Sequence, residues 1–223
     1  MSVIRCLGIS IPCLVFAVCV TSAAELSRYR EFDLGSSVAA VTAVTQSTER
    51  DLKTIHNRPA LLQEVVWQPR YMLGAPVADR NSINEMVFSF IDDQLFRMTV
   101  SYERSRTTGL TNADMIAALT ELYGVPAESR ARADVVDGLA LLAEWQHGDA
   151  SVALRRSQYS ESFSLVITSL SLEPVARKAR ATALVLDARE APAREAALAK
   201  RRADDQRQAE EQIRTANKNV FRP

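Results

Sequence analysis

Apolar residues recur with two different periods between residues 25 and 172. A spacing of three or four residues indicates a helix with one buried face, and strict alternation indicates a half-buried strand. The helical spacing occurs over 111–123 and predicts a helix there. Strict alternation predicts three strands after it, over 139–145, 151–156 and 163–170.

The predicted helix over 111–123 has a start and a stop signal of its own. Thr111 can accept a hydrogen bond from the backbone at Asp114, and Asp114 can return one, which is the pattern of a capping box. Gly124 ends the helix, and Pro126 prevents its continuation. His147, Gly148 and Asp149 are expected to form the first turn between the strands that follow.

An earlier stretch has the same order of elements. Val38, Val41 and Val44 form an apolar row that predicts a helix, and Thr48 and Asp51 resemble a second capping box, which predicts a short helix toward Asn57. Strands are expected over three further runs, namely 61–67, 85–91 and 95–102. Asp92, Asp93 and Gln94 should form the turn between the last two.

Alternation places a set of large apolar side chains on one face of that predicted hairpin. The set comprises Met86, Phe88, Phe90, Phe96, Met98, Val100 and Tyr102. Such a face has to be covered, and the preceding helix is the candidate.

Both stretches therefore contain a helix, a strand that ends in tryptophan (Trp67 and Trp145) and a hairpin. We interpret them as an internal duplication, with both tryptophans as packing residues. The predicted fold class is α+β, with two tandem helix-plus-three-stranded antiparallel sheet units over 25–108 and 109–172, followed by a long C-terminal helix.

The segment 173–223 differs in composition from the rest of the chain. It has 12 basic and 8 acidic residues and is rich in alanine, so it predicts a helix from Pro174 to Asn217, which Pro192 should bend or interrupt. No heptad of leucine or isoleucine is sustained, which argues against a stable coiled coil. The segment could be a solvated helix supported by pairs such as Glu190–Arg194 and Glu210–Arg214, or a partly disordered tail.

The first 24 residues have the three parts of a secretory signal peptide: one positive charge, a short apolar run and small residues up to Ala24. Cleavage near Ala24 would remove all three cysteines. Val18 and Pro12 precede Cys19 and Cys13, and neither is the small residue that lipoprotein processing requires. The expected product is a periplasmic or secreted chain of nearly balanced charge, which predicts no nucleic-acid partner.

The residues from Gly109 to Thr111, Met115 and Ile116, and the run from Tyr123 to Pro126 carry a resemblance. They resemble the Gly-x-Thr helix and Gly-x-Pro turn of the small outer-membrane assembly lipoprotein family. The tandem order is similar to that of secreted β-lactamase-inhibitor proteins. Both resemblances imply helices packed on an antiparallel sheet, and binding to proteins rather than catalysis.

Residues that could carry catalysis are few. His56 and His147 are the only histidines, and both lie at predicted turns. No spacing predicts a dedicated metal site, and no glycine-rich loop predicts a phosphate or dinucleotide cofactor. Asp92 and Asp93 suit a hairpin turn better than paired acid–base catalysis. We therefore expect no catalytic residue, no cofactor and no metal.

Two basic clusters are the candidate partner-binding residues. Arg155 and Arg156 lie in a predicted strand, with Arg156 able to face outward, and Lys200, Arg201 and Arg202 lie in the C-terminal helix. The leading hypothesis is an exported, non-enzymatic protein that binds a protein of the cell envelope. The basic run could instead meet an anionic membrane surface. The alternatives are an envelope hydrolase with an unrecognised site, or a carrier of a small apolar ligand.

Overall fold

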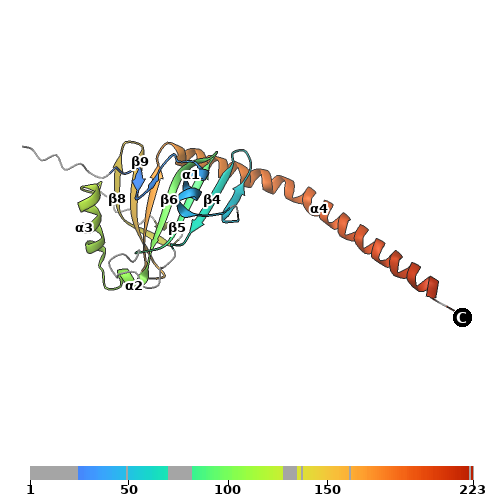
Figure 1. Cartoon of the computed structure of the whole chain (residues 1–223). Helices are drawn as coiled ribbons and strands as arrows, with labels where there is room; N and C mark the ends of the chain where they lie inside the picture. The colour runs from blue at the N-terminus through green and yellow to red at the C-terminus, as the bar shows by residue number, and fades with distance from the viewer. Residues whose placement is uncertain are drawn as a thin grey trace, which may run out of the picture.

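The computed structural model describes residues 25–48, 50–69, 82–127, 135–136, 138–160, 162–220 and residue 222. The chain has an α+β fold, in which one antiparallel sheet is combined with short helices and a long C-terminal helix (Figure 1). The predicted signal peptide lies outside the described residues.

The sheet is continuous from one end of the body to the other. Its strand order within the described residues is β3-β4-β5-β6-β10-β9-β8-β7, and every neighbouring pair is antiparallel. The strands are β3 (Leu52–His56), β4 (Leu62–Trp67), β5 (Ile83–Ile91), β6 (Gln94–Tyr102), the two-residue β7 (Val135–Val136), β8 (Leu139–His147), β9 (Ala150–Ser157) and β10 (Phe163–Ser169).

The strands of the two predicted units meet at the centre of this sheet. β6 pairs with β10 over Arg97–Ser101 and Ser164–Thr168, so the two units share one sheet. The three-stranded groups β4-β5-β6 and β10-β9-β8 therefore meet at this pair. The duplication itself stays a prediction.

The short helix predicted from Thr48 toward Asn57 is wrong, because Leu52–His56 is strand β3. The local signal does form: the Thr48 backbone N–H donates to an Asp51 carboxylate oxygen at 2.7 Å. It closes a turn rather than a helix. Leu52, Lys53 and Thr54 then pair with β4. The backbone hydrogen bonds between these strands take the place of those that a helix would have formed.

The two longer helices of the body are α1 (Val38–Thr45) and α3 (Asn112–Tyr123), with the short α2 (Arg104–Thr107) between them. The predicted capping box of α3 is confirmed, with Thr111 and Asp114 exchanging hydrogen bonds. The Thr111 backbone and hydroxyl donors lower the pKa of Asp114. Gly124 ends α3 with φ 81° and ψ −165°, a conformation that only glycine adopts readily.

One face of the sheet carries the main core. Val41 of α1 and Met115 and Leu119 of α3 pack on it, together with the small hairpin of β1 (Arg28–Tyr29) and β2 (Phe32–Asp33). Trp145 is buried there, and its indole N–H donates to the Gly124 carbonyl at 2.8 Å. Trp67 packs at the edge of the same core, as the sequence predicts for both tryptophans.

Phe96 lies on the opposite face from the one predicted. The pairing of β5 with β6 shifts register between Ser89 and Phe90, so that Leu95 enters the main core. Phe96 is therefore displaced into a second cluster, with Leu62 and Ile91. A one-residue slip reverses the face of a side chain, and the alternation alone did not reveal this slip.

The second cluster is covered by α4 (Leu172–Val220), the long helix in orange and red in Figure 1. The helix predicted over 174–217 is confirmed and is slightly longer. The helix continues through Pro192, so Pro192 does not interrupt it, and a bend at Pro192 stays a prediction. Among the described residues no helix is both long and apolar enough to cross a membrane.

Candidate functional site

α4 has two parts with different surroundings. We call Leu172–Ala191 the anchor, because it lies against the sheet, and Pro192–Val220 the arm, because it projects away from the body (Figure 1). Every arm residue is exposed except Asp204, which is partly covered. At about 1.5 Å per residue, roughly 30 helical residues extend about 45 Å.

The anchor packs through small side chains. Ala176, Ala179 and Ala183 are buried, and the first two contact the cluster that contains Leu62 and Phe96. Alanine lets the helix axis approach the sheet closely, and it costs no side-chain entropy on burial.

Ion pairs hold both ends of the anchor. Near its start, Arg97 of β6 donates to the carboxylate of Glu173. Near its end, Arg58 donates to Glu190 through both terminal nitrogens, at 2.6 and 2.5 Å. The carboxylate raises the pKa of Arg58, and the guanidinium lowers the pKa of Glu190. Bidentate arginine–carboxylate pairs of this kind fix the relative orientation of the two side chains as well as their distance.

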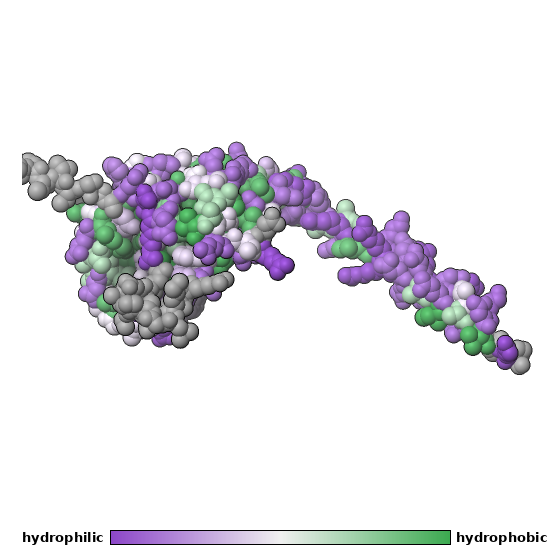
Figure 2. Space-filling view, viewed as in Figure 1, coloured by the Kyte–Doolittle hydropathy of each residue, from purple (hydrophilic) through white to green (hydrophobic). Residues whose placement is uncertain are grey.

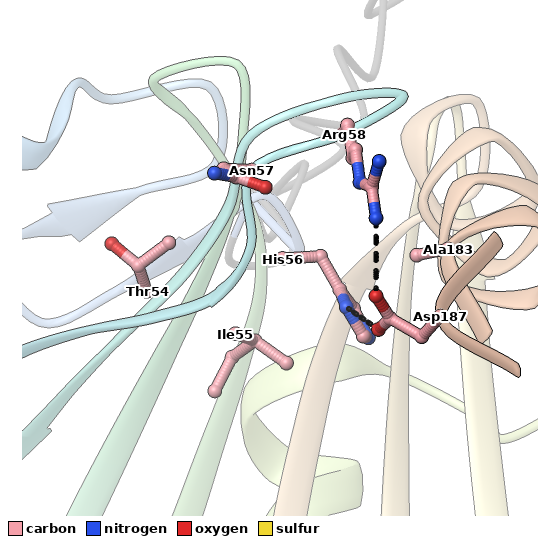
Figure 3. A pocket seen from close by; sticks show the side chains of 7 residues that line it. All are labelled: Thr54, Ile55, His56, Asn57, Arg58, Ala183 and Asp187. Carbon is pink, nitrogen blue, oxygen red and sulfur yellow. Dashed lines mark hydrogen bonds and ion pairs between the residues drawn. The ribbon is translucent and has the colours of Figure 1, made fainter. Parts of the chain in front are cut away.

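A cleft of about 270 Å³ lies between the end of β3 and the anchor (Figure 3). Figure 3 shows His56 and Arg58 both directed at Asp187, with His56 Nδ1 at 3.8 Å from one carboxylate oxygen and Arg58 Nη2 at 3.4 Å from the other. The Asp187 carboxylate also lies 3.6 Å from Arg194. This network joins β3 and the following loop to the helix, and His56 belongs to it.

The other histidine, His147, lines a cleft together with Ser171 and Leu172, at the start of α4. Asp149 accepts hydrogen bonds from the hydroxyls of Ser169 and Ser171, at 2.8 and 2.7 Å, and from the Ser171 backbone N–H at 2.8 Å. These donors, chiefly Ser171, lower the pKa of Asp149. His147 is exposed, and its imidazole makes no hydrogen bond or ion pair within the described chain. The serine hydroxyls bond to Asp149, not to a histidine.

Three tyrosines line a further cleft of about 440 Å³, between the β1–β2 hairpin, the end of β6 and α3. Burial, reinforced by neighbouring Tyr29, raises the pKa of Tyr102 well above its usual value. Burial likewise raises the pKa of Tyr123 to about 12. Tyr102 and Tyr123 are therefore neutral at physiological pH, so they offer hydroxyl groups and ring faces rather than negative charge.

Lys200, Arg201 and Arg202 lie on the exposed arm. None of their side chains forms an ion pair or hydrogen bond within the part of the chain that is described. The arm's own ion pairs are Arg207 with Asp204 and Arg214 with Glu211. Arg214 thus meets Glu211 rather than the predicted Glu210, and Glu190 binds Arg58 on the body. Figure 2 shows the arm as largely hydrophilic, with apolar patches along it.

Arg155 and Arg156 lie on β9, in the body. Arg155 reaches the Leu139 carbonyl at 3.5 Å. Arg156 donates to the Asn112 side-chain oxygen at 2.9 Å and lies over the Phe163 ring at 5.2 Å. It therefore joins β9 to the start of α3 and does not face outward as expected. The structure does not bring the two basic clusters together.

The anchor contacts join residues that lie far apart in the sequence. Arg58 and Glu190 are 132 residues apart, and no local pattern indicates such a pair. Among the described residues, no group of three or more histidine, cysteine, aspartate or glutamate residues could hold a metal ion. Comparison of the chain with family models, curated proteins and solved structures gives no match.

Proposed function

We propose that this chain is an exported, non-enzymatic protein that binds another protein, and that the arm is its binding element. The observation that carries the proposal is the contrast within α4. The anchor is fixed to the sheet by packing and by ion pairs at both ends, whereas the arm is exposed along its length.

Two physical arguments support a binding role for the arm. An isolated helix gains little stability from its own hydrogen bonds, and most helices in proteins are stabilised by packing one face. Leu198 and Ile213 are 51% and 61% exposed, and a partner helix or groove could bury them. The anchor sets the direction in which the arm leaves the body, which lowers the entropy lost on binding.

The test is capture of partners from envelope extracts by the chain starting at Glu25, compared with the same chain ending at Ala191. This end point keeps Asp187 and Glu190, which hold the anchor to Arg58. A third chain, with residues 192–220 reordered at constant composition, is the matched control for charge and helix content.

We expect the intact chain alone to capture its partner. Capture of the same proteins by all three chains would contradict a binding role for the arm. Capture by the intact and reordered chains, but not by the truncated one, would indicate attraction by composition alone.

A further inference from the structure

We propose that the arm pairs with the arm of a second copy of this chain, in antiparallel orientation, with the centre of the pair near Asp204. The inference rests on the proposed function, because it names the partner of the arm. It follows from three features of the arm: a row of small and apolar residues, the order of its charges, and its length.

One side of the helix carries residues spaced three or four apart, which places them on one face. From the anchor outward they are Ala188, Ala191, Glu195, Leu198, Arg202, Gln206, Ala209, Ile213, Ala216 and Val220. We call this face the seam. Seven of its ten members are alanine or larger aliphatic residues, and the polar ones lie toward its middle.

The seam is nearly symmetric about Asp204. Leu198 and Ala209 lie at similar distances along the helix on either side of it, and so do Ala191 and Ala216. Two antiparallel copies crossing at this point would therefore place these small or apolar residues opposite one another, whereas Glu195 would lie opposite Ile213. Alanine at these positions permits a close approach of the two helix axes.

The charges decide the orientation. Residues 194–202 include four basic side chains and one acidic one, whereas residues 204–211 include one basic and four acidic. In an antiparallel pair centred near Asp204, the basic block of each copy lies alongside the acidic block of the other, with Arg201, Arg202 and Asp205 nearest the contact. A parallel pair would place like charges together, which is unfavourable.

A specific contact follows from this arrangement. Arg201 and Asp205 lie four residues apart on the same flank of the seam. Antiparallel symmetry brings Arg201 of one copy to Asp205 of the other, and the reverse contact forms at the same time. Neither residue has an ion-pair partner within the described chain.

The length of the arm fits the same centre. Val220, the last residue of α4, would lie opposite Ala188, close to where Glu190 meets Arg58. The pair would thus use the free length of the helix and end where the body begins. Because the seam lacks sustained leucine heptads, pairing depends on the charged blocks and should weaken as salt rises.

The test is sedimentation of the chain starting at Glu25 over a range of concentrations, at low and at high salt. We expect a monomer–dimer equilibrium that shifts toward monomer at high salt. The variant K200E/R201E/R202E places acid opposite acid, so its dimer should be lost. Adding D204K/D205K/E210K to the same chain reverses both blocks and should restore the dimer.

Circular dichroism of each variant checks that the arm is still helical. A wild-type chain that stays monomeric at every concentration would overturn the inference, and so would a helical triple variant that dimerises as wild type does. Partner capture from extracts that still requires the arm would then leave the proposed function standing. In that case the pairing of two arms would be refuted, and the binding role of the arm would not.

Cysteine crosslinking tests the orientation, since the chain from Glu25 onward has no cysteine of its own. A mixture of Ala191→Cys and Ala216→Cys chains should form the mixed disulfide in preference to either symmetric one. Symmetric Ala191→Cys crosslinks in place of mixed ones would contradict the antiparallel pair. Ala181→Cys, on the exposed side of the anchor, is the negative control.

Discussion

Asp149 connects the sheet to the long helix through a single side chain. It lies in the turn between β8 and β9, yet its carboxylate accepts three hydrogen bonds from Ser169 and Ser171. The Ser169 hydroxyl in turn accepts the backbone N–H of Leu172, the first residue of α4. A negative charge at a helix start is also favoured by the helix dipole.

We expect Asp149→Asn to destabilise the body at neutral pH and to do so less as the pH falls. The pKa of Asp149 in the folded chain lies below its ordinary value of 3.8. Its ionised form therefore contributes stability above that value, and the contribution is lost as the pH falls through the lowered pKa. Urea denaturation at a series of pH values measures the difference between the two chains.

The difference should shrink in acid, where the wild-type carboxyl is itself protonated. Asp205→Asn on the exposed arm is the control and should leave the unfolding of the body unchanged. A difference that is constant across the pH range would mean that the Asp149 charge does not contribute.

At the scale of the element, α4 combines two kinds of helix in one. The anchor has the small buried residues of a packed helix, namely Ala176, Ala179 and Ala183. The arm continues the same backbone with exposed side chains. Since the anchor covers Phe96 and its neighbours, the position of the whole helix depends on a close fit at a few alanines.

We expect Ala179→Leu to destabilise the body, because the added carbons have no space between α4 and the second cluster. Overpacking of this kind costs about 1–3 kcal/mol. Ala181→Leu, two residues away on the exposed side, should change the free energy of unfolding by less than about 0.5 kcal/mol. Tryptophan fluorescence during urea denaturation measures both. Equal effects at the two positions would contradict the packing described for the anchor.

At the scale of the whole molecule, the chain consists of a body that holds the cores and an arm that leaves it (Figure 1). Trp67 and Trp145 both lie in the body, so tryptophan fluorescence reports on the body alone. The helical signal in circular dichroism comes in large part from α4. The two parts can therefore be followed separately in one sample.

Ending the chain at Ala191 should leave the unfolding of the body almost unchanged, within about 0.5 kcal/mol, because the residues removed are exposed. The fluorescence-detected midpoint in urea should stay in place while the helical signal falls. The comparison is made at a concentration where the intact chain is monomeric. A clear drop in the midpoint would mean that the arm packs on the body.

The sequence by itself determined the features that depend on neighbouring residues. The capping box of α3, its end at Gly124 and the helical state of 174–217 were all predicted, because propensity and caps act within a few residues. The Asp92–Asp93 turn is also local: both residues have positive φ, of 44° and 65°, as a tight hairpin requires.

Only the tertiary structure decided features that depend on distant partners. The turn at Thr48 leads into a strand because β4 provides hydrogen-bond partners for its backbone. Phe96 lies on the other face of the sheet because the register of β5 and β6 shifts. The pairing of β6 with β10 joins the predicted units, and Arg58 meets Glu190 across 132 residues. The same local pattern is compatible with several long-range pairings. The burial of apolar surface and the hydrogen bonds of the complete sheet select among them.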